Sequence, residues 1–393
     1  MSERFRRTRA EINLDHILYN YSAIRGLMKK NCKFMAVVKA DAYGHGVPIV
    51  SRVLSDCGVD YFGVSGLDEA IQLRNEGITN RILILGYTPA EWTDEILTTD
   101  AVQTVFSLEY AKSLSKQAQI HRKKLKVHIK VDTGMSRLGF VTFGGDDRIC
   151  RVIEEIREVC TLPHLIIEGI YTHFAVSDDV TSSFTREQYD RFCKLIHELE
   201  RIDITFPIRH SCNSAATINY PDMHMDMVRP GLILYGLYPS EVCYDKIHIK
   251  PVMEFKTVIS QIKDIAKGAT VSYGRTYTAD RDMCVAVLPV GYADGFLRKL
   301  SNNVDVLING QRAKQIGKIC MDQCVVDITG FGSVSEGESV TIFGKDLDEA
   351  ISVEELARIM NTINFEVVCL IGKRVPRIYL KNGKEVNIFN YIL

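Results

Sequence analysis

The chain has 393 residues, of which 46% are hydrophobic and 25% charged, and its formal net charge is −1. This length suffices for two domains with sizeable cores, and the composition is that of an ordinary soluble globular protein. A nearly neutral chain has no overall field to attract nucleic acid or an anionic membrane, so we expect neither as a partner.

The first half of the chain alternates short apolar runs with segments of helical periodicity. The clearest helical segment is Phe184–Ile202, in which Phe192, Leu195, Ile196 and Leu199 fall on one face. The runs that we expect to be strands are Phe34–Val38, Tyr61–Val64, Ile82–Leu85, Val102–Phe106, Val127–Val131, Leu165–Tyr171, Pro207–His210 and Val228–Leu234.

Eight such runs with helical connections indicate an α/β fold, a parallel (β/α)8 TIM-like barrel that covers residues 1–249. A doubly wound open sheet is the structural alternative. No glycine-rich dinucleotide fingerprint follows the first expected strand, which disfavours the open sheet.

The pattern changes near Lys250, after which short β-type runs are broken by Gly, Asn and Asp. Only Val353–Met360 is typical of a helix in this part. Residues 250–393 are therefore predicted to form a mainly antiparallel β domain. Its expected strands are Phe255–Ile265, Cys284–Pro289, Val304–Ile308, Gln323–Ile328, Ser339–Phe343 and Arg377–Leu380.

Eleven cysteines are scattered along the chain without a Cys-x-x-Cys pair. This usage argues for reduced thiols in a cytoplasm and against a disulfide framework. Cys320 and Cys324 lack a second ligand pair, and the histidines show no ligand spacing, so no metal is predicted. No apolar stretch is long enough for a signal or a membrane span. We therefore expect a cytoplasmic protein.

Candidate functional residues stand just after expected strands, where barrel enzymes place their sites. They are Lys39, Lys130, His173, Asn213 and Arg229. Lys39 has its stem in a dry environment, and desolvation there lowers the pKa of its amine. A carbonyl-condensing amine requires such a shift. Taken by its spacing alone, Lys39 is better interpreted as a solvated residue at a strand end.

The segment from Ala36 to Gly46, AVVKADAYGHG, resembles the pyridoxal-phosphate attachment motif of the alanine racemase family. The resemblance continues in the family's order through VDTGMSRLGF, YTHFA, HSCNSAA, VRPGLILYG, VSYGRTY, VGYADGF, ICMDQ and RVPRIY, from Val131 to Tyr379. It implies a homodimer with shared active sites, pyridoxal 5′-phosphate as cofactor, and interconversion of L- and D-alanine. It also implies a role in supplying D-alanine for peptidoglycan.

By this resemblance Lys39 holds the cofactor as a Schiff base and serves the proton on one face of the substrate Cα. Tyr273 matches the second base, which reaches the opposite face from the partner subunit. Its phenol needs a pKa well below about 10. His173 and Arg229 match the residues that lower it, and His210 supports Arg229. Arg229 also faces the pyridine nitrogen without giving up its own proton. The alternative for Tyr273 is a strand tyrosine packed on the face of its domain. The alternative for Arg229 is an arginine that caps the end of a strand.

The family's phosphate contacts match Ser214, Gly231 and Leu232, with the hydroxyl of Tyr43 added. Asn213, which is also predicted to contact the cofactor, precedes Ser214 in a run that equally fits an ordinary helix start.

Lys130 and Arg137 match a pair in which the lysine is often carbamylated and holds the arginine against the substrate carboxylate. A plain pair of Lys130 with Asp132 is the alternative. Met321 and Asp322 match residues that reach the substrate carboxylate across the dimer, and Tyr292 and Ile371 belong to the matched entrance corridor.

One departure from the family concerns the residue before RVPR, which is usually a tyrosine that touches the phosphate and narrows the pocket mouth. Here it is Lys373, which supplies a point charge but no aromatic wall. The resemblance therefore leaves open a serine racemase or one of broader specificity.

Two other function classes are alternatives to a racemase. An aldolase or a decarboxylase on a similar barrel is disfavoured, because an aldolase needs no phosphate-cofactor loops and no decarboxylase motif can be placed. A non-catalytic cofactor-binding regulator is expected to be a barrel alone, whereas this chain has a second domain with Tyr273, Met321 and Asp322.

Overall fold

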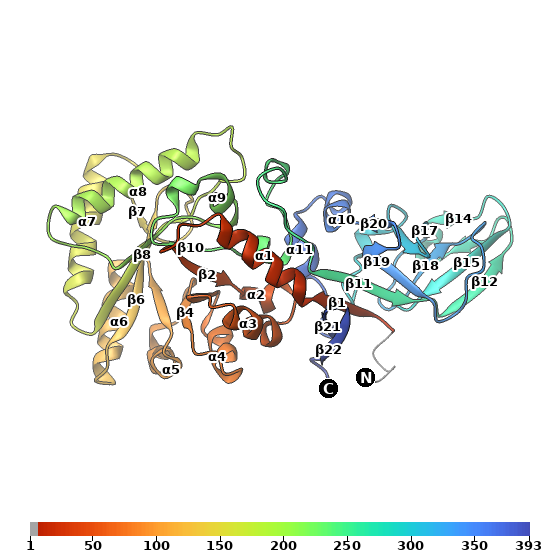
Figure 1. The fold of residues 1–393 in the computed structure, drawn as a ribbon, viewed down its shortest axis with the longest axis horizontal. Helices are drawn as coiled ribbons and strands as arrows, with labels where there is room; N and C mark the ends of the chain where they lie inside the picture. The colour runs from red at the N-terminus through yellow and green to blue at the C-terminus, as the bar shows by residue number, and fades with distance from the viewer. Residues whose placement is uncertain (1–6) are drawn as a thin grey trace. The chain divides into compact units, whose positions relative to one another are not determined.

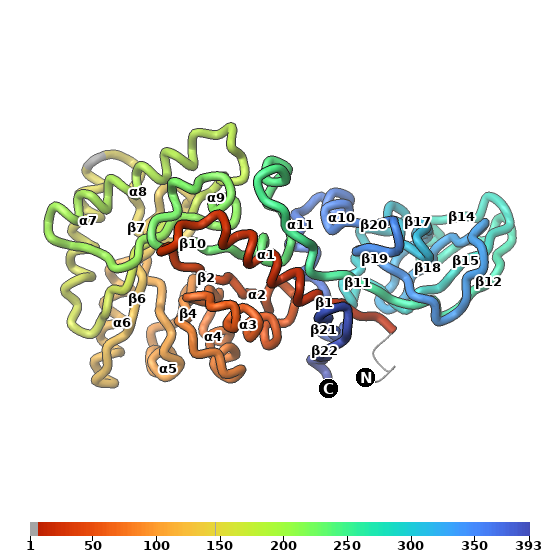
Figure 2. The backbone as a smooth tube through the Cα atoms, viewed as in Figure 1, coloured from red at the N-terminus to blue at the C-terminus, as the bar shows by residue number. Residues whose placement is uncertain are grey.

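The computed structural model describes residues 7–393 and divides into two compact units, drawn with the chain coloured from red to blue in Figure 1. The barrel unit consists of Ile17–Ala42 and Val47–Lys250. The β unit consists of Pro251–Leu393 together with Tyr43–Gly46 and residues 7–16. Along the coloured tube of Figure 2 the described chain thus contributes to the β unit before Ile17, briefly after Ala42, and again after Lys250.

The barrel unit is built on a parallel sheet with the strand order β10-β2-β3-β4-β5-β6-β8-β9. The two ends of this order meet through backbone hydrogen bonds from Asp226 to Arg209 and from Arg229 to Cys212, each of 3.0 Å. Eight parallel strands thus form a nearly closed barrel, which confirms the predicted fold. The strands are β2 (Lys33–Val37), β3 (Tyr61–Val64), β4 (Arg81–Ile84), β5 (Val102–Val105), β6 (Leu125–Asp132), β8 (Leu165–Tyr171), β9 (Ile208–His210) and β10 (Met227–Val228).

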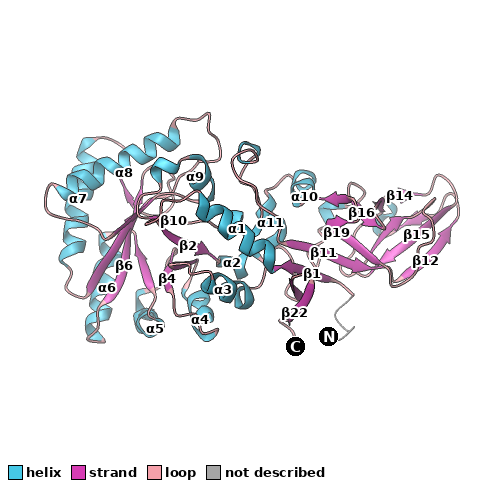
Figure 3. Ribbon diagram, in the orientation of Figure 1, coloured by secondary structure: helices cyan, strands magenta, loops and turns pink. Residues whose placement is uncertain are grey.

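Helices surround the barrel strands, as the cyan ribbons of Figure 3 show. Helix α8 (Phe184–Glu200) buries Phe192, Leu195, Ile196 and Leu199, which is the face that the sequence predicts. The other helices are α1 (Leu14–Gly26), α3 (Val47–Asp56), α4 (Leu67–Asn75), α5 (Thr93–Thr99), α6 (Leu108–Ile120), α7 (Asp146–Thr161) and α9 (Ser214–Asn219), with a short turn labelled α2 (Lys39–Tyr43).

The eighth strand is shorter than the predicted run Val228–Leu234. Strand β10 ends at Val228, and Leu232–Tyr235 form a 3₁₀ turn. Pro230 has no N–H to donate to a ladder, and Gly231 turns the backbone with φ −123° and ψ −95°. This turn places Arg229 and Gly231 at the carboxyl end of the barrel.

The barrel interior is filled by side chains, each from a different strand. The buried cluster consists of Met35, Tyr61, Leu83, Val102, Tyr171, Ile208 and Met227. The barrel is therefore a packed core, and only the ends of its strands are open to a ligand.

The β unit contains a sheet with the order β12-β15-β18-β17-β16-β19-β11-β1-β21-β22. Among the described residues, β1 with β21 is the parallel pair of this sheet and the other pairs are antiparallel, as predicted. The strands are β1 (Arg9–Asn13), β11 (Met253–Val258), β12 (Gln261–Ile265), β15 (Met283–Leu288), β16 (Asp305–Ile308), β17 (Gln311–Ile316), β18 (Cys324–Asp327), β19 (Ser339–Asp346), β20 (Glu349–Ile351), β21 (Arg377–Lys381) and β22 (Lys384–Phe389).

Several elements of the β unit differ from the predicted runs. The run Phe255–Ile265 is two strands, because Ile259 and Ser260 between them bond to Glu338 and Val287. Helix α10 (Val353–Met360) is confirmed, and Ser352 caps it by accepting from the N–H of Glu355. The short helix α11 (Asn364–Cys369) follows it.

No helix within residues 7–393 is both long and apolar enough to cross a membrane. The same residues contain no group of three or more His, Cys, Asp or Glu side chains that could hold a metal ion.

Candidate active site

Lys39 opens a left-handed turn at the carboxyl end of β2. Residues 40 to 43 all have positive φ, between 51° and 57°, although none of them is glycine. Each such residue costs roughly 1–2 kcal/mol, so the turn persists only because its surroundings hold it. The holding bonds are Ala42 N–H to Val38 at 2.8 Å, Ala40 N–H to Glu69 at 2.7 Å, and Val47 N–H to Asp41 at 2.8 Å.

Arg229 is buried at the same end of the barrel. Its Nη1 lies 3.0 Å from Nδ1 of His210, and its Nη2 lies 3.2 Å from Nδ1 of His173. The carbonyls of Thr172 and Ser211 accept further bonds from Nη2, at 2.8 and 3.0 Å. Burial lowers the pKa of Arg229 to about 10, which still leaves it protonated at neutral pH. The guanidinium therefore only donates, and both histidines accept at Nδ1.

Lys130 is a buried lysine in a cationic environment. Burial, followed by the charges of Arg137, Arg229 and Lys39, lowers the pKa of its amine to about 8. Asp132 acts in the opposite direction, but its carboxylate already accepts from the backbone N–H groups of Gly134, Ser136 and Arg137 at 2.9 to 3.1 Å.

Four cationic side chains thus converge at the carboxyl end of the barrel: Lys39, Lys130, Arg137 and Arg229. Burial and these four charges hold the pKa of His173 well below its usual value, so His173 is neutral. Lys130 and Arg229 are buried, Lys39 is half-buried and Arg137 is exposed. An excess of positive charge that reaches from a buried site to the surface favours an anionic ligand.

Ser214 and Gly231 are brought together beside this group. The Ser214 hydroxyl is buried and accepts from the N–H of Gly231 at 2.8 Å, so its own hydrogen remains for another acceptor. Asn213 caps α9 by accepting from Ala216 at 2.9 Å, as its alternative interpretation predicts. Leu232 follows Gly231 at the start of the 3₁₀ turn.

Tyr273 lies in the β unit, at the tip of a hairpin formed by β13 (Thr270–Val271) and β14 (Tyr277–Thr278), and it is 70% exposed. Ser272 anchors this tip with its hydroxyl, which donates to Lys318 at 2.6 Å and lies 3.3 Å from the Cys320 sulfur. The hairpin therefore lies beside the loop that carries Met321, whose side chain is 52% exposed.

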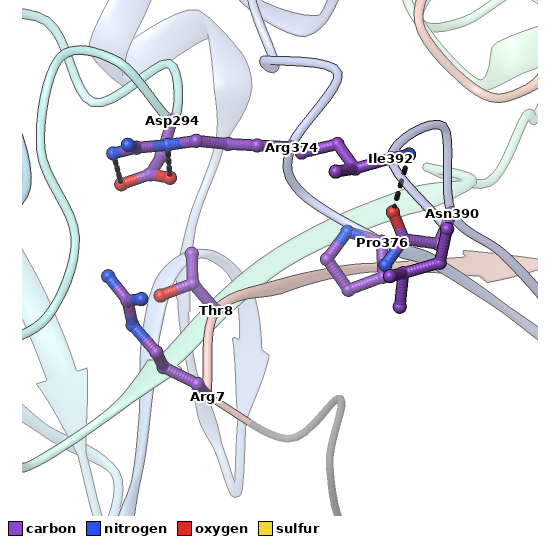
Figure 4. A pocket seen from close by; sticks show the side chains of 8 residues that line it. Arg7, Thr8, Asp294, Arg374, Pro376, Asn390 and Ile392 are labelled. Atoms are coloured by element: carbon purple, nitrogen blue, oxygen red, sulfur yellow. Dashed lines mark hydrogen bonds and ion pairs between the residues drawn. The ribbon is translucent and has the colours of Figure 1, made fainter.

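Arg374 fixes this loop from the other side. Its Nε and Nη2 bond to the buried carboxylate of Asp294 at 2.6 and 3.0 Å, which Figure 4 shows as two dashed lines. Its Nη1 pairs with Asp322 at 2.7 Å, and its Nη2 donates to the carbonyl of Met321 at 3.3 Å. Arg374 and Asp294 stand in the blocks RVPRIY and VGYADGF, yet nothing in their spacing predicts that they pair.

A cavity of about 350 Å³ adjoins this pair within the β unit (Figure 4). Its lining consists of Arg7, Thr8, Asp294, Arg374, Pro376, Asn390, Ile392 and Leu393. Arg374 therefore lines this cavity and also contacts the loop of Met321 and Asp322.

The buried Arg377 joins two segments of the β unit, one that carries Tyr43 and one that carries Lys373. Arg377 donates to Gly44 at 3.1 Å and to the carbonyls of Ile371, Gly372 and Val375 at 2.6 to 2.8 Å. The Tyr43 ring meets Phe365 edge-on at 6.3 Å, and burial raises the pKa of its phenol. Lys373 is exposed in the turn that Arg377 holds.

Residues 12–239 match the family model described as alanine racemase, N-terminal domain, and residues 252–379 match that of the C-terminal domain. The chain belongs to the alanine racemase family. Its predicted class, an isomerase of this family, is thereby confirmed. The chain is 44% identical over 384 residues to alanine racemase 1 of Clostridium acetobutylicum, with 98% of each chain covered.

Solved structures of this family share the fold. An alanine racemase of Clostridium difficile 630 matches with a TM-score of 0.94 and 38% identity, covering 98% of this chain and 99% of that chain. A histidine racemase from Leuconostoc mesenteroides subsp. sake matches with a TM-score of 0.86 and 26% identity, covering 96% and 98%. The same fold thus occurs in racemases named for different amino acids.

Proposed function

We propose that this protein interconverts L-alanine and D-alanine with pyridoxal 5′-phosphate as its cofactor. The observation that carries the proposal is the group of four cations around the strained turn of Lys39, in a chain of this family. Two anionic groups need this positive charge, the cofactor phosphate and the substrate carboxylate.

The residues at the barrel end fit pyridoxal 5′-phosphate. Lys39 offers the primary amine that an aldehyde cofactor requires, and Ser214 has a hydroxyl hydrogen left to donate to a phosphate oxygen. Arg229 offers a guanidinium that donates without losing its proton to a ring nitrogen. When bound, the cofactor links to an amine and delocalises the charge left when the substrate α-proton departs. Gly231, Leu232, Asn213 and Tyr43 are the further residues proposed to hold it.

Inversion at the α-carbon requires a proton carrier on each face. Lys39 Nζ holds and returns the proton on one face, and the Tyr273 hydroxyl of a second copy of the chain does so on the other. The proposal that a second copy takes part is supported by large hydrophobic side chains that are exposed in the single chain. These are Tyr273, Met321 and Tyr292. A homodimer that buries this surface completes the site.

Arg229 and His173 prepare Tyr273 for its task. Because His173 accepts from Arg229 at Nδ1, its hydrogen is on Nε2 and is free to be donated to a phenolate oxygen. Such a hydrogen bond and the nearby positive charge of Arg229 stabilise the phenolate form of the tyrosine.

Lys130 is proposed to react with carbon dioxide. Its neutral amine forms an N–C bond to the carbon of CO₂ while one C–O π bond opens and its electrons go to oxygen. The nitrogen releases one proton to water, so that a carbamate with one negative charge replaces the neutral amine. The lowered pKa supports this step, because only the neutral amine is a nucleophile. The carbamate then relieves repulsion among the cations and holds Arg137 against the substrate carboxylate. Asp132 cannot take this role fully, because its oxygens bind backbone N–H groups.

Met321 and Asp322, also from the second copy, are proposed to complete the substrate site, Met321 through its backbone N–H. Lys373 favours a second candidate function, racemisation of serine beside alanine, because an exposed lysine replaces the aromatic wall. In a cytoplasm the product D-alanine would supply peptidoglycan synthesis.

The test is incubation of the protein and cofactor with L-alanine in deuterated water. We expect the optical signal to decay to zero, deuterium to enter at Cα, and no carbon dioxide to be released. A visible absorbance band that borohydride bleaches reports the amine-bound cofactor. Release of carbon dioxide, or retention of the L form, contradicts the proposal, and Lys39→Ala is the inactive control.

A further inference from the structure

The hydrogen bonds of Arg229 continue into the barrel beyond His210. Nε2 of His210 lies 2.9 Å from Nδ1 of His128, and neither imidazole is exposed to solvent. His128 lies on β6, two residues before Lys130, with its side chain in the barrel interior. Arg229, His210 and His128 thus form one buried row.

The position of every hydrogen in this row follows from Arg229. A guanidinium has no acceptor, so Nδ1 of His210 must accept and the hydrogen of neutral His210 must be on Nε2. That hydrogen is donated to Nδ1 of His128, which places the hydrogen of His128 on its own Nε2. Burial and the charge of Arg229 hold the pKa of His210 well below its usual value, and burial lowers that of His128 to about 3. Both rings are therefore neutral.

Packing holds both rings in place. Tyr171 stacks on His210 with a centroid distance of 4.7 Å and an angle of 11°, and its hydroxyl is tied to Thr104 at 2.9 Å. Gly169, opposite His128 on β8, leaves room for that ring, because a Cβ there would meet Cε1 of His128 at 2.7 Å. Neither ring has space to turn away from its hydrogen bonds.

We propose that His128 is a positioning residue that fixes the tautomer of His210, and through it the orientation of Arg229. The proposal deepens the proposed function and rests on it, since Arg229 is taken to face the cofactor ring. It adds a residue from the barrel interior to the group of residues at the carboxyl ends of the barrel strands.

Removal of the acceptor at His128 leaves His210 with two unfavourable states. It either keeps a buried N–H on Nε2 without a partner, or moves the hydrogen to Nδ1, where it faces the Nη1 donor of Arg229. The second state pushes Arg229 away, and His173 on its Nη2 shifts with it. Arg229, the proposed donor to the cofactor ring, and His173, the proposed donor to the Tyr273 oxygen, are then both misplaced.

The test compares His128→Asn with His128→Leu, two side chains of similar size. The asparagine oxygen stands near the position of Nδ1 and can accept from His210, whereas leucine cannot. We expect leucine to lower kcat about tenfold or more, equal to about 1.4 kcal/mol, with KM nearly unchanged, and asparagine to restore most of it. His248→Leu at an exposed position is the control. Equal damage from asparagine and leucine, or none from leucine, overturns the proposal.

A second measurement is independent of turnover and of whether the leucine variant folds. In the unmodified holoenzyme labelled with ¹⁵N-histidine, and assigned with His210→Gln, we expect the His210 signals of a ring protonated on Nε2. Protonation on Nδ1 overturns the proposal. If the protein fails to racemise alanine while His210 is protonated on Nε2, the proposed function falls and the tautomer assignment stands.

Discussion

Asp294 accepts two hydrogen bonds from Arg374, at 2.6 and 3.0 Å, although only 3% of its surface is exposed. The same carboxylate accepts from the N–H of Gly291 at 3.0 Å. The other side of the guanidinium holds Asp322 and the Met321 carbonyl. A buried anion thus fixes, through one planar side chain, the loop proposed to bind the substrate carboxylate.

Arg374→Lys should loosen this loop, because an ammonium cannot reproduce the two parallel bonds to Asp294 or reach Asp322 at the same time. We expect KM for alanine to rise more than kcat falls. The free energy of unfolding should drop by about 1–3 kcal/mol, since a buried acceptor loses a partner. Steady-state kinetics and thermal unfolding measure both. Arg281→Lys, in the ion pair with Asp327, is the control. Equal effects of the two substitutions would show that Arg374 does not hold the loop of Met321 and Asp322.

Lys39→Ala should abolish the visible absorbance of bound cofactor and nearly all turnover, because the variant lacks the amine to which the aldehyde links. The matched control is Lys33→Ala at the start of β2, whose lysine pairs with Asp60 at 3.9 Å. Absorbance spectra before and after borohydride decide the matter. A linkage that survives in Lys39→Ala would show that another lysine carries the cofactor.

Tyr273→Phe removes a hydroxyl from a side chain that is 70% exposed, so the fold should be unaffected. Racemisation should collapse, because one face of the α-carbon loses its proton carrier, while the absorbance change on adding L-alanine should persist. Tyr277→Phe in the same hairpin is the control. A Tyr273→Phe protein with near-normal racemisation would exclude the phenol from the reaction.

If each site uses Tyr273 from the second copy, two inactive variants can restore one another. Lys39→Ala and Tyr273→Phe proteins, mixed and reassembled, should regain part of the activity, because some mixed dimers have one intact site. Activity is measured before and after mixing, with each variant alone as the baseline. The absence of any recovery, with exchange of subunits verified, would indicate sites built within a single chain.

Carbamylation of Lys130 should depend on pH in a defined direction. The pKa of the amine is about 8, so below pH 8 it is mostly an inert ammonium and above pH 8 mostly a reactive amine. With dissolved ¹³CO₂ held constant, the carbamate ¹³C signal should therefore increase from pH 6 to pH 9. Lys130→Gln should lose the signal, whereas Lys126→Gln, at an ion pair with Asp100, should keep it. A signal that decreases as the pH rises would contradict the assignment.

Strong local patterns made much of the fold predictable. The apolar runs before Lys39 and Arg229 predict buried parallel strands, and the periodicity of Phe184–Ile202 predicts the buried face of α8. The polar strands β17 and β22 were missed, because exposed residues such as Gln311 and Lys384 carry no alternating pattern. Strand β1 depends on pairing with β11 and β21, more than 200 residues away along the chain.

The candidate site likewise contains residues that the sequence predicts and residues that it does not. Residues in blocks that resemble the family, such as Lys39 and Arg229, could be named from the sequence. His128 could not, because a histidine in an apolar strand gives no signal until the fold places it 2.9 Å from His210. The grouping of positive charges cannot be predicted from the sequence either. The effect of Arg137 and Arg229 on the pKa of Lys130 depends on their distances in the folded chain.

We expect Lys373 to influence the selectivity of the substrate pocket. Lys373 is exposed in a turn whose backbone Arg377 holds, so a substitution there should leave the turn intact. At the pocket mouth, where we propose that Lys373 stands, a lysine leaves room and adds a donor, whereas an aromatic wall would exclude a hydroxymethyl group. We therefore expect alanine to be the best substrate and serine to be racemised at a measurable secondary rate.

Lys373→Tyr should increase the preference for alanine with little change in cofactor content. Pocket contacts of this kind shift discrimination by about 1–3 kcal/mol, or roughly 10–200-fold, so the change should be partial. The ratio of kcat/KM for L-alanine to that for L-serine, measured in both proteins, provides the test, and Lys373→Met separates the loss of charge from the gain of a ring. An unchanged ratio would mean that other residues close the pocket, with the buried Ile371 and the exposed Tyr292 as the next positions to vary.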